Sequence, residues 1–160
     1  MEGIEIRRAS VAQAKTIAKL NDYVHQKHVE AVPAFFKKKS LQEATEIFEQ
    51  ILAIENAYAF IAWHKRKAVG YTLCFLQYRE ETPFTYSRRF IVVDQISVNP
   101  NYSGKGIGRL LFKAILNVAE LHQIQEIDAT TWSFNESARA FFETCGFKPQ
   151  LNRLSLSLIE

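Results

Sequence analysis

The sequence is poor in the features that mark secreted, membrane-bound or disulfide-stabilised proteins. Only two of its 160 residues are cysteines, which excludes a disulfide framework. No segment approaches the ~20 consecutive apolar residues that a membrane-spanning helix needs. The first residues carry charges where a signal peptide would have an apolar run. We therefore expect a cytoplasmic protein that does not associate with a membrane.

An excess of charge of one sign is also missing. The chain has 20 Lys and Arg against 17 Asp and Glu, and its formal net charge is +3. The basic residues are scattered, and the densest cluster, residues 37–39, is short. Nucleic-acid binding needs a basic stripe together with a readable module, so we expect no nucleic-acid partner. The four histidines, at positions 25, 28, 64 and 122, show no metal-ligand spacing, and we expect no metal.

The composition is that of one globular domain. Apolar residues make up 48% and aromatic residues 12% of the chain, enough for a compact core. A length of 160 residues predicts a single domain over residues 1–160. Cys74 lies in an apolar strand-like run and Cys145 at a buried helical spacing, so both are expected to be core thiols.

Hydrophobic periodicity predicts a mixed α/β chain in the order β-α-α-β-β-β-α-β-α-β. Capping boxes at Ser10 and Ser40 begin the first two helices, and Asn135 caps the last. Residues 25–39, which include Pro33, are expected to be irregular. The expected strands cover residues 3–8, 57–63, 68–78, 90–98, 126–131 and 147–158, and the longest expected helix covers residues 107–121.

A glycine-rich run, residues 103–108 (Ser-Gly-Lys-Gly-Ile-Gly), joins the predicted strand 90–98 to the helix that follows. Glycine can adopt backbone conformations that other residues avoid and lets backbone N–H groups approach a ligand closely. The unpaired N–H groups and partial positive charge of a helix start favour a phosphate or pyrophosphate. A glycine turn that merely links strand to helix is the alternative.

The spacing of this run excludes two common phosphate loops. A P-loop needs Gly-Lys followed by Ser or Thr, whereas Lys105 lies between two glycines. The dinucleotide fingerprint needs a third glycine at the position of Arg109, although Asp128 lies at a suitable distance downstream. The run also falls late in the chain rather than after the first strand.

Residues 103–108 resemble motif A of the GNAT superfamily of N-acetyltransferases, written Gln/Arg-x-x-Gly-x-Gly/Ala. Residues 135–147 (Asn-Glu-Ser-Ala-Arg-Ala-Phe-Phe-Glu-Thr-Cys-Gly-Phe) resemble motif B, written Asn-x-x-Ala-x-x-Phe/Leu-Tyr-x-x-x-Gly-Phe. Two motifs in the family's order and spacing are more specific than either alone. The resemblance covers essentially the whole chain, because the order of the predicted elements fits as well.

The resemblance implies the GNAT fold, a mixed α+β architecture. It has a central, mostly antiparallel twisted sheet of six to seven strands flanked by about four helices, with a splayed strand pair that binds CoA. It also implies that the chain moves an acetyl group from acetyl-CoA to a primary amine of a small molecule or peptide. The amine would attack the thioester directly in a ternary complex, without a metal. A homodimer would also be in keeping with the family.

The resemblance further implies which residues bind acetyl-CoA. The 103–108 loop and Arg109 would bind the pyrophosphate, and residues 96–98 would pair with the pantetheine arm and supply an oxyanion-binding N–H group. Motif B would contribute further contacts. The implied cofactor-binding residues are Ile96, Ser97, Val98, Ser103, Gly104, Lys105, Gly106, Ile107, Gly108, Arg109, Asn135, Ala138, Phe141 and Phe142.

Asp94 is the candidate general base. Strand alternation would place Asp94, Ile96 and Val98 on one side and Gln95 and Ser97 on the other. Many family members carry an acidic residue at this position, which can take a proton from the incoming ammonium. The alternative is that Asp94 only orients the substrate or pairs with an arginine such as Arg88.

The acceptor pocket of this fold is built by the first helix pair and its connection. Aromatic rings with one or two carboxylates would suit a cationic amine. Glu80 or Glu81 could add attraction, and polyamines, aminoglycosides, amino acids and protein N-termini all remain open as acceptors. The expected acceptor residues are His25, His28, Glu30 and Phe35.

Two departures from the family pattern allow a rival hypothesis. Ser103 replaces the Arg or Gln that begins motif A, and Phe142 replaces the Tyr that commonly protonates the leaving thiolate. The rival is a non-catalytic acyl-CoA-binding sensor or interaction module, and a purely structural domain is a third possibility. An assay of acetyl transfer to a panel of amines would distinguish the acetyltransferase from the non-catalytic module. Affinity for CoA would distinguish both from a purely structural domain.

Phe142→Tyr tests how much the missing hydroxyl matters. A thiolate is a tolerable leaving group near neutral pH, so the loss of that acid need not abolish turnover. We expect the substitution to leave the affinity for acetyl-CoA nearly unchanged, as measured by calorimetry. A large loss of affinity would contradict this assignment of Phe142.

Overall fold

The computed structural model describes residues 3–158, and the chain divides into two compact units that are treated separately. The first unit, Met1–Thr130, contains the sheet and three α-helices. The second, Thr131–Glu160, contains one α-helix.

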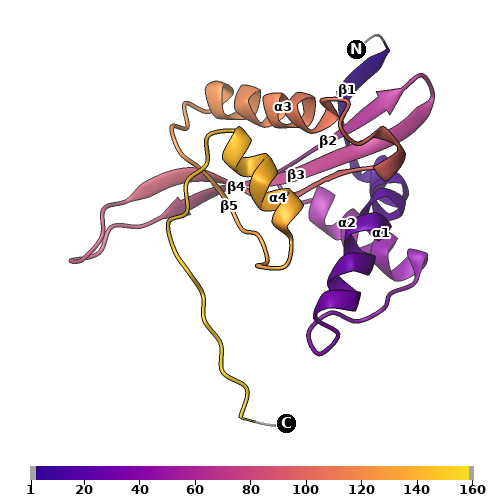
Figure 1. The fold of residues 1–160 in the computed structure, drawn as a ribbon. Helices are drawn as coiled ribbons and strands as arrows, with labels where there is room; N and C mark the ends of the chain where they lie inside the picture. The colour runs from indigo at the N-terminus through magenta and orange to yellow at the C-terminus, as the bar shows by residue number, and fades with distance from the viewer. Residues whose placement is uncertain (1–2, 159–160) are drawn as a thin grey trace. The chain divides into compact units, whose positions relative to one another are not determined.

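The sheet of the first unit has five strands in the order β1-β2-β3-β4-β5 (Figure 1). The first four pair antiparallel, and β5 pairs parallel to β4, so the sheet is mixed and mostly antiparallel as expected. Lys65, at φ +57°, lies in the tight turn between β2 and β3. The strands are β1 (Ile4–Arg8), β2 (Ala57–His64), β3 (Lys67–Arg79), β4 (Arg88–Val98) and β5 (Ile127–Ala129).

The predicted count of six to seven strands is wrong for the described residues. Residues 147–158 form no strand, although leucine and serine alternate along the end of this segment. Leu154 and Leu156 are 92% and 84% exposed. A period of two specifies which side chains share a face, but a strand also needs a neighbouring backbone to pair with.

The first helix is longer than predicted. A 3₁₀ turn, η1 (Val11–Gln13), follows the capping box at Ser10 and leads into α1 (Ala14–Ala31). Residues 25–31 are therefore helical, and the prediction that they are irregular is wrong. Nothing between His25 and Ala31 breaks a helix, whereas Pro33 restricts the residue before it to extended conformations. The helix accordingly ends two residues before the proline.

The second helix, α2 (Leu41–Leu52), begins at the predicted capping box. The hydroxyl of Ser40 accepts a hydrogen bond from the N–H of Glu43 at 3.1 Å, and the Glu43 carboxylate accepts one from the N–H of Ser40 at 2.7 Å. These two bonds satisfy backbone groups that a helix start otherwise leaves unpaired.

Helices cover both faces of the sheet in the first unit (Figure 1). On one face, α1 and α2 pack on β2 and β3 through a core that includes Ile17, Phe48 and Leu73. On the other face, α3 (Ile107–Leu121) packs Ile107 and Leu111 against the sheet. The two faces therefore have separate apolar cores, and each strand residue can be assigned to one of them.

The second unit contains α4 (Glu136–Thr144) and the segment that follows it. Asn135 caps the helix as predicted, since its Oδ1 accepts a hydrogen bond from the N–H of Ala138 at 3.3 Å. Gly146, at φ +94°, adopts the left-handed conformation common just after a helix end.

The two cysteines lie in different surroundings. Cys74 is fully buried in β3, as expected of a core thiol, and burial raises the pKa of its thiol to about 12. Cys145, just after α4, is half-buried. A neutral thiol is a poor nucleophile, so Cys74 is structural.

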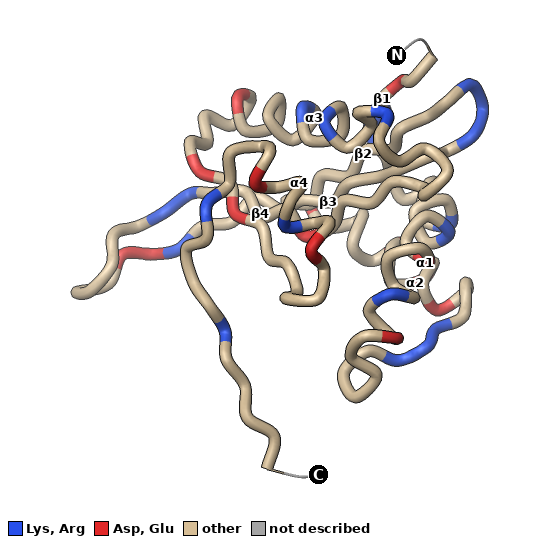
Figure 2. Tube along the Cα trace, in the orientation of Figure 1, with Lys and Arg blue, Asp and Glu red and all other residues tan. Residues whose placement is uncertain are grey.

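Charges of both signs are interspersed along the described chain (Figure 2). Within residues 3–158, no helix has the length and apolar character needed to cross a bilayer. The same residues contain no cluster of three or more His, Cys, Asp or Glu side chains suited to a metal ion.

Candidate active site

Asp94 is the extra residue of a β-bulge in β4. Leu73 of β3 pairs with Gln95, but the next residue, Cys74, pairs with Val93, so Asp94 has no partner in the register. The bulge disturbs the ladder at Gln95, whose carbonyl accepts a hydrogen bond from the Thr72 hydroxyl at 2.8 Å. A bulge of this kind bends the strand and places two successive side chains on one face.

The bulge overturns the expected alternation of side chains along β4. Ile96 and Val98 pack with the α3 core, whereas Gln95 bonds to Tyr71 of the α1/α2 core. Asp94 accepts a hydrogen bond from Gln95 and therefore lies on the α1/α2 side with it. Sequence alternation had placed Asp94 with Ile96 and Val98, because a bulge leaves no trace in hydrophobic periodicity.

A chain of hydrogen bonds runs from the core to Asp94. The amide oxygen Oε1 of Gln95 accepts from the Tyr71 hydroxyl at 2.5 Å and from Asn21 Nδ2 at 3.3 Å. Asn21 Nδ2 also donates to the Tyr71 hydroxyl at 3.0 Å. Because the Oε1 atom serves two donors, Nε2 of Gln95 must face the other way, where it donates to Asp94 Oδ2 at 2.9 Å.

Tyr71 anchors this network from a fully buried position in β3. Burial raises the pKa of Tyr71 well above its ordinary value, the hydrogen bond from Asn21 opposes the shift, and the charge of Asp94 adds to it. The phenol therefore stays neutral and keeps its proton to donate to Gln95. Asp94 is thus held in one orientation by neutral side chains rather than by a cation.

The β4–β5 pair opens beside the bulge. β5 pairs with β4 only over Ile91, Val92 and Val93, while β4 continues to Val98. The described part of β5 therefore leaves one edge of residues 94–98 without a strand neighbour. This geometry agrees with the splayed strand pair that the family resemblance implies.

Arg88 links β4 to β5 at the end where the two strands are paired. Its guanidinium donates to both carboxylate oxygens of Asp128, each at 2.7 Å, and it also pairs with Glu126. Hydrogen bonding to Asp128, the main cause, raises the pKa of Arg88 above its ordinary value, against the opposing effect of desolvation. Arg88 is committed to this end of β5, so the alternative in which Asp94 pairs with Arg88 is wrong.

The glycine-rich loop follows directly from the open edge of β4. Gly104 and Gly106 adopt φ of +73° and +71°, and Gly106 is the N-cap of α3. Among the described residues, no acceptor pairs with the N–H groups of Gly104, Lys105 or Gly106. The first turn of α3 offers further N–H groups with no partner inside the helix. The loop therefore presents the unpaired donors that an anion requires.

Cationic side chains surround this loop. Lys105 Nζ lies 5.0 Å and Lys67 Nζ 5.7 Å from the centroid of the Tyr102 ring, within cation–π range. Arg109 is exposed in the first turn of α3. These charges, together with the unpaired N–H groups, make the loop a favourable place for an anion. Ser103, also exposed, contributes its backbone to the turn through a bond from its N–H to the Pro100 carbonyl at 3.1 Å.

Asn99 fixes the turn between β4 and the loop. Its side chain is buried, accepts from the N–H of Asn101 at 3.0 Å and donates to the Tyr23 hydroxyl of α1 at 3.1 Å. Its own N–H donates to the Val69 carbonyl at 2.8 Å. Strand, turn and loop are therefore held to both β3 and α1.

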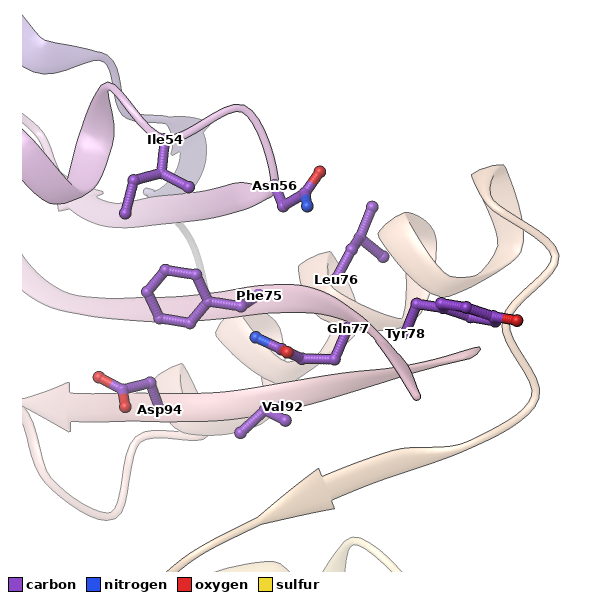
Figure 3. Close-up of a pocket in the computed structure, with 8 residues that line it drawn as sticks. All are labelled: Ile54, Asn56, Phe75, Leu76, Gln77, Tyr78, Val92 and Asp94. Atoms are coloured by element: carbon purple, nitrogen blue, oxygen red, sulfur yellow. The ribbon is translucent and has the colours of Figure 1, made fainter. Parts of the chain in front are cut away.

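A shallow groove of about 680 Å³ begins at Asp94 (Figure 3). Its walls are formed by β3, by β4 and by the connection between α2 and β2. Sequence reasoning found Asp94 but missed Ile54, Phe75 and Val92 in this lining. Nothing in the sequence distinguishes these three from ordinary core residues.

The four residues expected on the acceptor side do not line this groove. His25 Nε2 donates to the Lys37 carbonyl at 2.9 Å and His28 Nδ1 to the Val24 carbonyl at 2.7 Å. Phe35 packs on Phe36 at 4.9 Å between ring centroids, and Phe36 also contacts His28 at 4.9 Å. Glu30 accepts from Gln26 at 3.0 Å. These side chains are engaged with one another and with the end of α1.

The motif B residues all lie at or in α4 of the second unit. Asn135 and Ala138 make the cap, and the ring of Phe142 contacts those of Phe141 at 5.4 Å and Phe147 at 5.0 Å between centroids. Their part in cofactor binding stays a prediction.

A sequence model described as the acetyltransferase (GNAT) family matches residues 22–147. The chain belongs to the GNAT acetyltransferase family. The match includes both motifs, α1 from its middle onward and all strands except β1. A comparison with curated proteins gave no significant match.

Several solved structures share the fold. The BH1408 protein from Bacillus halodurans is similar, with a TM-score of 0.90 and 26% identity over 96% of this chain and 99% of that one. An aminoglycoside N-acetyltransferase, AAC(6')-Iy, in complex with CoA has a TM-score of 0.76 and 16% identity over 96% and 93% of the two chains. A ribosomal-protein-alanine N-acetyltransferase from Brucella melitensis biovar Abortus 2308 has a TM-score of 0.71 and 19% identity over 97% and 99%.

The hydrogen bond between Tyr71 and Gln95 should be measurable in a double-mutant cycle. Tyr71→Phe removes a buried donor, and we expect it to lower the free energy of unfolding by about 1–2 kcal/mol in urea titrations. Combined with Gln95→Leu, it should show a coupling energy of about 1 kcal/mol. Tyr86→Phe, at an 87% exposed position, is the control and should change nothing. Additive effects of the two substitutions would contradict the network.

Proposed function

We propose that this chain is an N-acetyltransferase that moves an acetyl group from acetyl-CoA to a primary amine in a ternary complex. One observation carries the proposal. The unpaired edge of β4, residues 94–98, continues through the turn fixed by Asn99 into the 103–108 loop, whose N–H groups are unpaired. A long thioester that ends in a pyrophosphate needs these two elements in this order. The CoA complex of AAC(6')-Iy, a protein of the same fold, supports the choice of ligand.

The 103–108 loop would hold the pyrophosphate through the N–H groups of Gly104, Lys105 and Gly106 and the first turn of α3. Ile107 and Gly108 are the first two residues of that helical turn, and Lys105 and Arg109 add positive charge beside it. Residues 96–98 would pair with the pantetheine arm as a neighbouring strand does. Acetyl-CoA supplies an acyl group already activated as a thioester, so positioning and electrostatics can provide most of the rate acceleration.

Asp94 would accept the proton that the amine must lose. The amine arrives as an ammonium ion, and its nitrogen becomes a nucleophile only after a proton leaves. The new bond joins this nitrogen to the acetyl carbon, and the nitrogen releases its second proton to water. The carbon–sulfur bond breaks, and CoA departs as a thiolate that takes up a proton from water. Gln95 holds one carboxylate oxygen of Asp94, and the described residues provide no partner for the other, Oδ1. That oxygen can face the ammonium.

We further propose that residues 1–160 act as one domain in which Asn135, Ala138, Phe141 and Phe142 of α4 contribute to cofactor binding. The family match supports this, because residues 22–147 include parts of both units. The presence of motif B at the family's spacing from motif A gives the same indication.

The second candidate function is a non-catalytic acyl-CoA-binding module. Phe142 favours it, because a phenylalanine packed among other phenylalanine rings has no proton for a leaving thiolate. Ser103 favours it too, since it cannot replace the longer donor of motif A. The two functions share the CoA site and differ in whether transfer to an amine occurs.

Gly106→Asp tests the anion loop. The substitution puts a carboxylate among the donors, and we expect it to weaken acetyl-CoA binding at least about tenfold by calorimetry, because like charges repel at close range. Gly106→Asn is the matched control, since asparagine has the same shape, no charge and tolerance for positive φ. Equal losses in the two variants, or no binding by the parent protein, would contradict pyrophosphate binding at this loop.

A further inference from the structure

We infer that the groove at Asp94 is the acceptor site and that it takes a small primary monoamine attached to one compact apolar group, such as an aromatic ring. The inference rests on the proposed function, and it goes further by naming the class of acceptor. Its basis is the juxtaposition, in one groove, of a single oriented carboxylate with a continuous apolar wall.

The carboxylate and the apolar wall are adjacent by register. Phe75 of β3 pairs with Val92 of β4, one step from the Cys74–Val93 pair that borders the bulge. Side chains paired across strands share a face, so Phe75 and Val92 lie on the α1/α2 side beside Asp94. Figure 3 shows Phe75 and Asp94 toward one end of the groove and Tyr78 at the other.

The opposite wall is fixed rather than free to move. Ile54 and Asn56 come from the connection that follows α2. The carbonyl of Asn56 accepts from the N–H of Leu76 at 3.0 Å, and the carbonyl of Ile54 accepts from the N–H of Ala57 at 3.0 Å. These bonds fix the backbone at Ile54 and Asn56, and the apolar side chain of Ile54, 48% exposed, contributes to the lining of the groove.

The charges of the lining specify a monoamine. Asp94 is the one acidic residue in the groove lining, which contains no Lys or Arg, and the remaining polar side chains include the neutral amides of Asn56 and Gln77. One ammonium ion would find one counter-ion in Asp94. A polyamine or an aminoglycoside would place further ammonium ions beside Ile54, Phe75 and Val92, where the lining offers no second anion to pair with them. Aminoglycoside acetyltransferases have the same fold, but the lining of this groove favours a different class of acceptor from an aminoglycoside.

The position of the groove also suits transfer. Asp94 belongs at once to the groove and to the strand edge along which the pantetheine arm would run. An amine held by Asp94 therefore lies beside the expected position of the thioester. The volume of about 680 Å³ is in the range of small-molecule sites.

The experiment compares the acetylation of 2-phenylethylamine, spermidine, kanamycin and a free octapeptide, each with acetyl-CoA, by following CoA release. We expect kcat/KM for 2-phenylethylamine to exceed that of each other amine at least about tenfold, the scale of one well-placed apolar contact. A preference for spermidine, kanamycin or the octapeptide would overturn the inference.

Gln77→Glu sharpens the test, because it adds a second carboxylate of the same shape at an exposed position in the groove. We expect it to shift the ratio of kcat/KM values toward spermidine by about tenfold. Gln50→Glu makes the same change of charge at an exposed position on α2 outside the groove and should leave the ratio unchanged. Equal shifts in the two variants would show a general charge effect and count against the groove.

A binding measurement separates failure of this inference from failure of the proposed function. In a ¹⁵N amide NMR titration of the whole protein with 2-phenylethylamine, we expect the largest shift changes at residues 75–78 and 92–94. Changes elsewhere, or none, would overturn the groove as the amine site even if acetyl-CoA binds. If the amine binds in the groove but calorimetry shows no acetyl-CoA binding, the acetyltransferase proposal fails and the amine site stands.

Discussion

Leu73 of β3 pairs with Gln95 of β4, and the next residue, Cys74, pairs with Val93. At this point β4 therefore has one extra residue, which is Asp94. The candidate site depends on this bulge. It turns Asp94 and Gln95 toward the same face, whereas an unbroken strand would separate them. The bulge lies one residue beyond the last pair that β4 makes with β5, and from there the edge of β4 has no strand neighbour. A carboxylate and an open strand edge therefore meet at one point of the chain.

The surrounding structure holds this region in place from several sides. Tyr71 and Asn21 fix Gln95, and through it Asp94, from the core beneath α1. Arg88 ties β4 to β5 at the closed end of the pair, and Asn99 ties the far end of β4 to α1. Such support preorganises a site, because donors and acceptors need not reorganise when substrates bind. The 103–108 loop begins where this support ends and adds the unpaired N–H groups of the anion site.

The sequence predicted what depends on local pattern. Capping at Ser40 and Asn135, the helix over residues 107–121 and the strands at 57–63 and 68–78 follow from neighbouring residues and were confirmed. The 147–158 strand failed because a strand also requires a partner, and the bulge was invisible because it depends on how two strands pair. The groove was missed for a related reason. Phe75, Val92 and Ile54 are apolar residues whose role is decided by tertiary position alone.

The central claim is that acetyl-CoA lies along the open edge of β4 with its pyrophosphate in the 103–108 loop. The most direct measurement is a ¹⁵N amide NMR titration of the uniformly labelled protein with CoA. The account predicts that the largest chemical-shift changes fall at Gly104, Lys105, Gly106 and the start of α3, and continue through residues 94–98 of β4. Changes confined to other surfaces, with these amides unaffected, would contradict it.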